Sequence, residues 1–219
     1  MSLQRAKPTR RERAKEDKSR RIVAAARALF AAHGVSGVTT QQIADRADVA
    51  VGTLFRYAAS KAELLIKVQN EKFAAAIKEG LAAADVAPRT VPATEVVLAV
   101  LTPVVDCVRE QPENGRTYLH ELVFGDPNEV NRRDGLILTE QLEGGISQAL
   151  ERFGRIEHGE ATVLARVITA IVHISATATI HLDQSAADLL ADIRTQIDTV
   201  IAPRGSRDPV PATQREALS

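Results

Sequence analysis

The chain has 219 residues, with 28 basic and 28 acidic residues, one Cys and no Trp. A single cysteine excludes an internal disulfide and suits a reducing cytoplasm. Hydrophobic residues make up 45% of the chain and aromatic residues only 3%, and alternating strand-like runs are scarce, so we expect an all-α protein. No charge-free apolar stretch reaches the roughly 20 residues that span a bilayer, and the longest candidate, Val167–Leu182, is too short.

The helical spacing of apolar residues predicts about nine helices. Their expected ranges are 18–33, 40–47, 51–57, 60–84, 93–110, 113–124, 127–153, 158–182 and 185–201. Ser60 and Glu63 form a capping-box pattern at the start of the fourth helix, which is long enough to join an N-terminal head to a C-terminal body. Pro127 is expected in the first turn of the seventh helix, 127–153. Residues 203–219 are polar and rich in proline, and we expect them to be disordered.

The neutral total hides an uneven distribution of charge. Residues 1–61 contain thirteen Lys or Arg and five Asp or Glu, a balance of +8, so the remainder carries −8. A basic N-terminal module on an acidic body is typical of a protein that binds phosphates at one end. Residues 1–17 have almost no apolar pattern, which predicts a disordered basic arm. This arm either lies along DNA or serves as a solvated tail, and it lacks the apolar segment of a secretion signal.

Residues 36–64 have the pattern of a short helix, a tight turn and a second short helix. Thr39 and Thr40 are N-cap residue types, and Asp48 favours a turn. Residues 51–57 make about two helical turns, which is too short for a helix that is stable alone. A short helix with small residues in its first turn is typical of a recognition helix in a DNA major groove. The alternative is a helical hairpin in an all-α core, without a nucleic-acid role.

This region resembles the DNA-binding domain of the TetR family of bacterial transcriptional regulators, over about residues 18–66. The matching motifs are Ala28-Leu29-Phe30, His33-Gly34, Thr39-Thr40, Ile43-Ala44, Ala47-Asp48-Val49, Gly52 to Tyr57 and Ser60 to Leu65. One position departs, because Ala58 stands where the family usually carries an aromatic residue. The resemblance implies a helix-turn-helix at 39–58 within a DNA-binding domain at 18–66, and a helical regulatory and dimerisation domain at 67–202.

The DNA contacts are expected at the starts of the second and third helices and just beyond the third. Thr40 suits a phosphate contact, and Gln41 can reach a phosphate or a base edge. Arg56 is assigned to a phosphate in preference to a guanine. The resemblance places Val51, Gly52 and Thr53 against base edges, Val51 by apolar contact alone, and Tyr57 and Lys61 on the DNA backbone. The expected internal packing residues are Ile43, Ala44, Ala47, Val49, Leu54 and Phe55.

The last two predicted helices are apolar on more than one face, so both sides need to be covered. In the family that the chain resembles, such helices pair with their copies into a four-helix dimer interface. The predicted interface residues are Val163, Val167, Ile171, Ile174, Ala178, Leu189, Ile193 and Ile197. Burial within one subunit is the alternative.

The resemblance also implies a ligand cavity in the body, whose occupancy separates the two heads by tilting the fourth helix. The candidate ligand-binding residues are polar or aromatic groups on otherwise apolar faces: Tyr118, His120, Glu121, Phe124, His173 and Thr177. The sequence does not identify the ligand. A core or surface role is the alternative for each of these residues.

These patterns lead to one expected function. We expect a cytoplasmic homodimeric repressor, associated with the nucleoid when bound to DNA, that binds a palindromic operator and is released by a small molecule. A ligand-independent DNA-binding protein or a helical interaction module is the alternative. No CxxC, HExxH, GxGxxG or P-loop spacing occurs, and the five histidines have no acidic or cysteine constellation. We therefore expect no enzyme activity, no catalytic residue, no metal and no cofactor.

Overall fold

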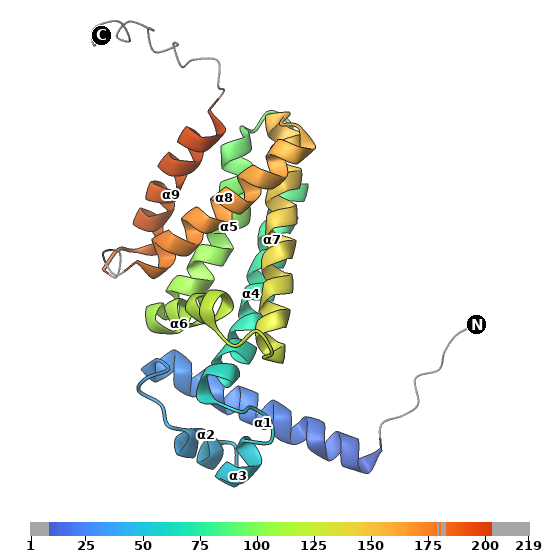
Figure 1. Ribbon diagram of the computed structural model, residues 1–219, viewed down its shortest axis with the longest axis vertical. Helices are drawn as coiled ribbons and strands as arrows, with labels where there is room; N and C mark the ends of the chain where they lie inside the picture. The colour runs from blue at the N-terminus through green and yellow to red at the C-terminus, as the bar shows by residue number, and fades with distance from the viewer. Residues whose placement is uncertain (1–8, 179, 181–182, 203–219) are drawn as a thin grey trace, which may run out of the picture.

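The computed structural model describes residues 9–178, 180 and 183–202, and this part of the chain folds into nine α-helices without a strand (Figure 1). The helices are α1 (Arg10–His33), α2 (Thr40–Arg46), α3 (Val51–Leu54), α4 (Lys61–Asp85), α5 (Ala93–Arg109), α6 (Pro112–Phe124), α7 (Val130–Gly154), α8 (His158–Thr177) and α9 (Ala186–Ile201). The predicted all-α fold is confirmed. The predicted tail at 203–219 and the first eight residues of the predicted arm lie outside the described residues.

The start of α1 differs from the prediction, because residues 10–17 are helical. Thr9 and Glu12 form a complete capping box: the Thr9 hydroxyl accepts from the Glu12 N–H, and the Glu12 carboxylate accepts from the Thr9 N–H at 2.6 Å. Such a cap satisfies two of the free N–H groups at a helix start. The polar composition of this segment suggested disorder, but the cap and the propagation of α1 from its apolar half favour helix.

The head consists of α1, α2, α3 and the first two turns of α4, around a small core of its own. Ile22, Phe30, Ile43, Leu54 and Leu64 are among its fully buried side chains. Thr39 and Ser60 cap α2 and α4 as their sequence positions predict. The short α2 and α3 are therefore held by side chains from the longer helices, as their length requires.

Helix α4 is a member of two cores. Leu65 and Val68 belong to the head core, whereas Ile66 and Phe73 belong to the larger core of the body. Farther along, α4 crosses α5 closely, since a Cβ placed on Gly80 would lie 2.2 Å from the carbonyl oxygen of Val100. Backbone contact at this crossing explains why a residue without a side chain is needed there.

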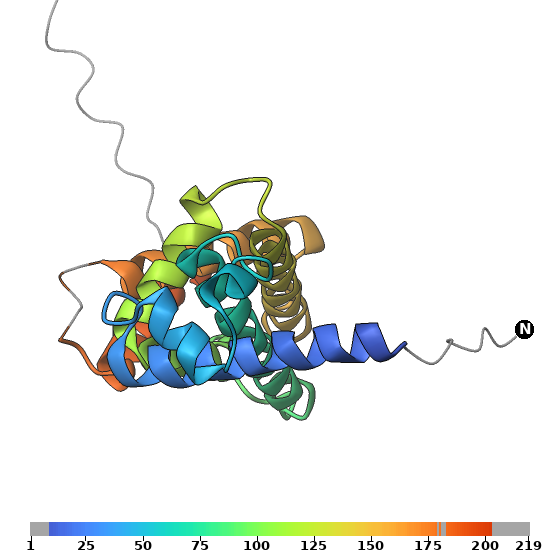
Figure 2. The same cartoon turned by 90° about the horizontal axis from the view of Figure 1, so that it is seen from below.

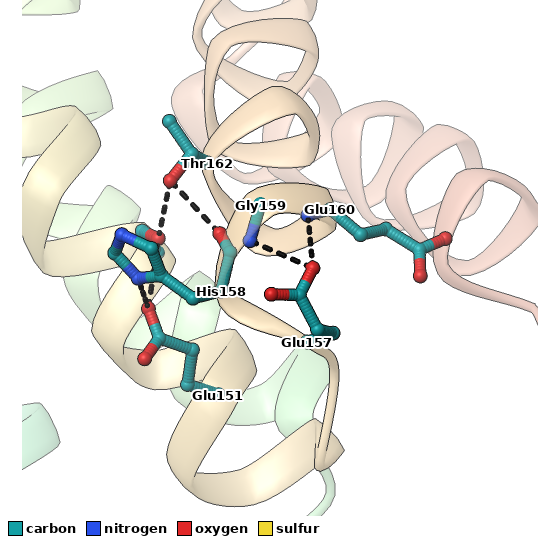
Figure 3. A network of polar contacts seen from close by, with 7 residues as sticks. Glu151, Glu157, His158, Gly159, Glu160 and Thr162 are labelled. Carbon is teal, nitrogen blue, oxygen red and sulfur yellow. Dashed lines mark hydrogen bonds and ion pairs between the residues drawn. The ribbon is translucent and has the colours of Figure 1, made fainter.

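The body is a bundle in which α5 is surrounded by α4, α6, α7, α8 and α9 (Figure 1). Helix α8 is the one described helix whose length and hydropathy would allow it to cross a membrane, with 39% of that window buried inside the protein. Its buried face packs against α7, α6 and α9, and its other face is exposed and apolar. The junction before α8 is held by polar contacts: Glu157 caps the helix, and His158 pairs with Glu151 of α7 at 2.9 Å (Figure 3).

Three helix ends depart from the sequence predictions. Helix α3 ends at Leu54, with the residues up to Tyr57 in turns. Helix α7 begins at Val130, because Glu129 provides the cap, accepting from the N–H groups of Asn131 and Arg132. Pro127 therefore lies in the preceding turn and not in the first helical turn. Helix α8 ends at Thr177, five residues before its predicted end.

Candidate DNA interface and ligand cavity

The turn between α2 and α3 is fixed by local geometry and by α1. Asp48 has a positive φ of 52°, a conformation that Asp tolerates better than most residues. The N–H of Val49 returns to the carbonyl of Ala44 at 3.0 Å. Arg21 of α1 pairs with the Asp48 carboxylate at 3.2 Å. The angle between α2 and α3 is therefore stabilised both by hydrogen bonds within the turn and by this ion pair with α1.

The structure places the predicted DNA-binding residues on the head, at the end of the molecule opposite the body (Figures 1 and 2). Gln41, Gly52 and Arg56 are exposed, and the remaining five are half-buried: Thr40, Val51, Thr53, Tyr57 and Lys61. The Lys61 ammonium donates to the carbonyl of Val38 at 2.8 Å, so it joins the start of α4 to the loop before α2. The assignment of all eight residues to DNA stays a prediction.

Gly52 is not required by packing inside the protein. A Cβ at this position meets no atom within 4 Å, and Gly52 is not among the residues with positive φ. Glycine inside a helix costs about 1 kcal/mol relative to alanine. Because nothing in the head explains this cost, the small size of Gly52 points to close approach by something outside the chain.

Two neighbouring positions differ from their expected roles. Phe55, expected in internal packing, is 47% exposed, because α3 ends before it and the side chain lies outside the head core. Ala58, where the family usually has an aromatic residue, is 3% exposed and belongs to the head core. The head therefore closes around a methyl group at this position.

An apolar cavity of about 80 Å³ lies inside the body, bounded by α4, α5, α6, α7 and α8. Of the six predicted ligand-binding residues only His173 lines it. The other lining residues, which sequence reasoning missed, are Phe73, Val104, Val108, Leu119, Leu122, Val123, Leu136, Thr139, Leu142, Thr169 and Val172. Burial, followed by the proximity of His120, lowers the pKa of His173. The cavity wall is therefore apolar apart from His173 and two threonines, Thr139 and Thr169, whose hydroxyls donate to carbonyls of their own helices.

The other predicted ligand-binding residues have different surroundings. Tyr118 is fully buried, donates to the Asn70 side-chain oxygen at 2.8 Å and contacts the Phe73 ring edge-on. His120 is exposed and stacks against Phe124, which is also exposed. Glu121 is half-buried near the end of α6. The Thr177 hydroxyl donates a hydrogen bond to the His173 carbonyl. These five residues are absent from the cavity wall, so they do not contact the interior of this cavity.

The predicted dimer-interface residues divide into two groups. Val163, Val167 and Ile174 of α8 are exposed, and Ile171 and Ala178 are half-buried. Leu189, Ile193 and Ile197 of α9 are fully buried inside the subunit, where α9 packs against α5 and α8. A side chain already covered by its own subunit cannot contact a copy, so these three are wrong as interface residues.

Comparison with known proteins agrees with this geometry. Residues 22–68 match the family of bacterial regulatory proteins described as the tetR family. The HTH-type transcriptional repressors KstR of Mycobacterium tuberculosis and of Rhodococcus jostii are each 42% identical to the chain over 60 residues. That match covers 27% of this chain and 27% and 28% of the two relatives, so it spans about a quarter of the length of these curated proteins.

Solved structures extend the likeness to the body. A TetR transcriptional regulator from Rhodococcus sp. RHA1 aligns over 86% of this chain and 97% of its own, with a TM-score of 0.63 and 20% identity. Thermus thermophilus FadR in complex with lauroyl-CoA aligns over 90% of this chain and 99% of its own, with a TM-score of 0.64 and 18% identity. Bacillus subtilis FadR in complex with stearoyl-CoA aligns over 84% of this chain and 97% of its own, with a TM-score of 0.57 and 19% identity. The head is therefore similar to the tetR family over residues 22–68, and the fold of the described residues is shared with these regulators.

Proposed function

We propose that this protein is a sequence-specific DNA-binding repressor that acts as a homodimer on a palindromic operator. The observation that carries the proposal is the open surface over Gly52 at the start of α3. A duplex can approach the backbone there, with Val51 and Thr53 facing base edges and Arg56 free to reach a phosphate. Repression is taken from the curated relatives, which are named as repressors.

The dimer rests on the exposed apolar face of α8. Val163, Val167 and Ile174 lie on this helix with 59%, 39% and 65% of their surfaces exposed, and large exposed apolar patches commonly mark protein interfaces. A single helix as short as α3 reads few bases. Two copies related by a two-fold axis would read half-sites about 34–36 Å apart, or a multiple of that spacing.

The apolar cavity is the proposed ligand site. Its lining holds no Asp, Glu, Lys or Arg, so the part of the ligand that enters it is apolar and uncharged. His173 is available for one hydrogen bond, and the Thr169 hydroxyl, which donates to the Ala165 carbonyl, can only accept one. The acyl chains of the CoA esters bound by the two FadR proteins have this chemistry. A ligand that binds one arrangement of the heads better than the other changes operator affinity by linkage.

A ligand-independent repressor is the second candidate, and the cavity volume favours it. Ligand pockets usually measure about 300–1,000 Å³, whereas this cavity measures about 80 Å³. An acyl chain would therefore have to displace some of the lining side chains in order to enter.

DNA binding is tested with a duplex selected by the wild-type protein from random 30-base-pair sequences. Arg56→Ala and Lys61→Ala should each weaken binding and make its salt dependence shallower, by about 0.9 in slope for each phosphate that is no longer neutralised. Lys78→Ala is the control, because Lys78 is exposed on the part of α4 that belongs to the body. Failure of the wild type to select any sequence would refute the proposed function.

Ligand response is tested by adding lauroyl-CoA or stearoyl-CoA to the preformed complex. Release by either compound should be abolished in Val172→Phe, which fills the cavity, and retained in Ile137→Phe, which changes an exposed position on α7, another helix that bounds the cavity. If neither compound releases the DNA, the acyl-CoA class is wrong. If broader ligand screens also leave the complex intact, the ligand-independent repressor takes first place.

A further inference from the structure

Helix α1 continues well beyond the head core as an exposed rod. Its first core residue is Ile22, and the twelve residues from Arg10 to Arg21 precede it within the same helix. In Figures 1 and 2 this part of α1 runs outward past the other helices, at the end of the molecule where α2 and α3 lie. We call residues Arg10–Lys18 the helical extension.

The charged residues of the helical extension are separated by face. Arg11, Lys15 and Lys18 follow an i, i+4, i+7 spacing, which places them in one stripe along the helix. The stripe continues into the head as Ile22, so the face that is apolar inside the head is basic outside it. Glu12 and Glu16 are one residue further along from Arg11 and Lys15, on a different face.

The three stripe residues are also uncompensated. Arg11, Lys15 and Lys18 are exposed, and within the described part of the chain they form no ion pair or hydrogen bond. Arg20 and Arg21 both pair with Asp17, and Arg21 also pairs with Asp48, whereas Arg10 and Arg13 lie outside the stripe. The Glu12 carboxylate is occupied by the capping box.

Arg21 sets the position of the stripe relative to the proposed DNA surface. Its contact with Asp48 places α1 directly beside the turn that leads into α3. From there to Arg10 the helix rises by about 16 Å, at 1.5 Å per residue, which is close to the length of five base pairs at 3.4 Å each.

We propose that Arg11, Lys15 and Lys18 bind the phosphate backbone of duplex DNA flanking the half-site that α3 reads. The partner is identified by charge complementarity and by continuity with the DNA surface of the head, and this inference rests on the proposed function. Phosphate contacts position a protein without reading sequence. The helical extension therefore lengthens the bound site while leaving its sequence preference unchanged.

The test uses the full-length protein and the duplex that the wild type selects. The stripe variant carries Arg11→Gln, Lys15→Gln and Lys18→Gln. The control variant carries Arg10→Gln, Arg13→Gln and Arg20→Gln, which removes the same charge from the other faces of the same helix. Affinity is measured across a salt series, and backbone protection is mapped by hydroxyl-radical footprinting.

The stripe variant should bind at least about tenfold more weakly than the control, with a salt slope shallower by about 0.9 for each phosphate that the variant leaves unbound. Its footprint should shrink only at the outer flank, while it selects the same sequence. Equal losses of affinity in the two variants would show a general effect of charge and overturn the proposal, as would an unchanged footprint. If the wild type selects no DNA at all, the proposed function itself fails, and this outcome is distinct from the others.

Discussion

The side-chain amide of Asn114 donates a hydrogen bond to the backbone carbonyl of Phe30 at 2.8 Å, and both residues are buried. This bond joins the first turn of α6 to the last turn of α1. Beside it, the Glu113 carboxylate accepts from the Ser36 N–H at 2.8 Å. Because Leu119 and Leu122 of the same helix line the cavity, α6 touches both the proposed ligand site and the head.

Replacing Asn114 by alanine should loosen this joint. The free energy of unfolding should fall by about 1–3 kcal/mol, the usual cost of removing one partner of a buried hydrogen bond. Amide exchange at Gly34 and Ser36 should become faster. Asn128→Ala, in the exposed turn before α7, is the control. Once a releasing ligand is known, Asn114→Ala should also weaken its effect on DNA affinity, and an undiminished effect would exclude α6 as a coupling element.

The Gly52→Ala substitution should separate stability from function. Because the added methyl group meets open space, unfolding should become harder by up to about 1 kcal/mol. Operator affinity should nevertheless fall at least about tenfold, because the methyl group holds base edges away from α3. Gly144→Ala in α7 is a matched control, since a Cβ there also meets no atom within 4 Å. Unchanged DNA binding by the Gly52 variant would argue against α3 as the reading helix.

The proposed role of the exposed face of α8 in dimerisation can be tested by introducing a charged side chain there. Ile174→Glu should raise the dimer dissociation constant by at least about tenfold, because an unpaired carboxylate would be buried at the interface. Sedimentation velocity over a concentration series measures the effect. Val86→Glu is the control, since Val86 is 82% exposed just after α4. A wild type that sediments as a monomer at all concentrations would contradict the dimer itself.

The joint between α7 and α8 should make stability depend weakly on pH. The hydrogen bond with Glu151 raises the pKa of His158 above its ordinary 6.5, and the bond with His158 lowers the pKa of Glu151 below its ordinary 4.5. A raised histidine pKa stabilises the fold below about 6.5 and loses this effect as the pH rises through the folded value. A lowered carboxyl pKa stabilises above about 4.5 and loses its effect on acidification.

The pair should therefore contribute most between about pH 4.5 and 6.5. Thermal unfolding of wild type and His158→Asn should differ most in this range and converge as the pH rises through the raised pKa of His158. Both groups are on the surface, so the difference should be small and should shrink in high salt. A difference that stays constant across the pH range would mean that the ion pair is not its source.

Most helices could be predicted because their ends carry local signals. Ser60 caps α4 and Thr39 caps α2, each by accepting from a backbone N–H three residues on. The same signal is present at Thr9 and Glu12, but the scarcity of apolar residues near them suggested disorder. A helix that is anchored at one end can extend through a polar segment, because its nucleus has already formed farther along the chain.

The cavity and the interface could not be predicted from single residues. A polar residue on an apolar face, such as Tyr118, can find its hydrogen-bond partner inside the core. The Tyr118 hydroxyl donates a hydrogen bond to the side-chain oxygen of Asn70. Cavity walls such as Leu122 and Val172 have the same pattern as any buried helix face. Likewise, Ile193 of α9 and Ile174 of α8 both lie on apolar stripes, and only the packing of α9 on its own subunit distinguishes them.

The sharing of α4 between two cores restricts how such proteins can be recombined. Leu65 and Ile66 are adjacent in sequence but belong to different cores, so the helix must keep a fixed rotation between head and body. One residue inserted after them would turn the whole body by about 100° relative to the head, whereas about seven residues would restore the direction after two turns. Chimeras that give this head to another regulator should therefore preserve the residue count along α4, and length changes there should be tolerated only in whole turns.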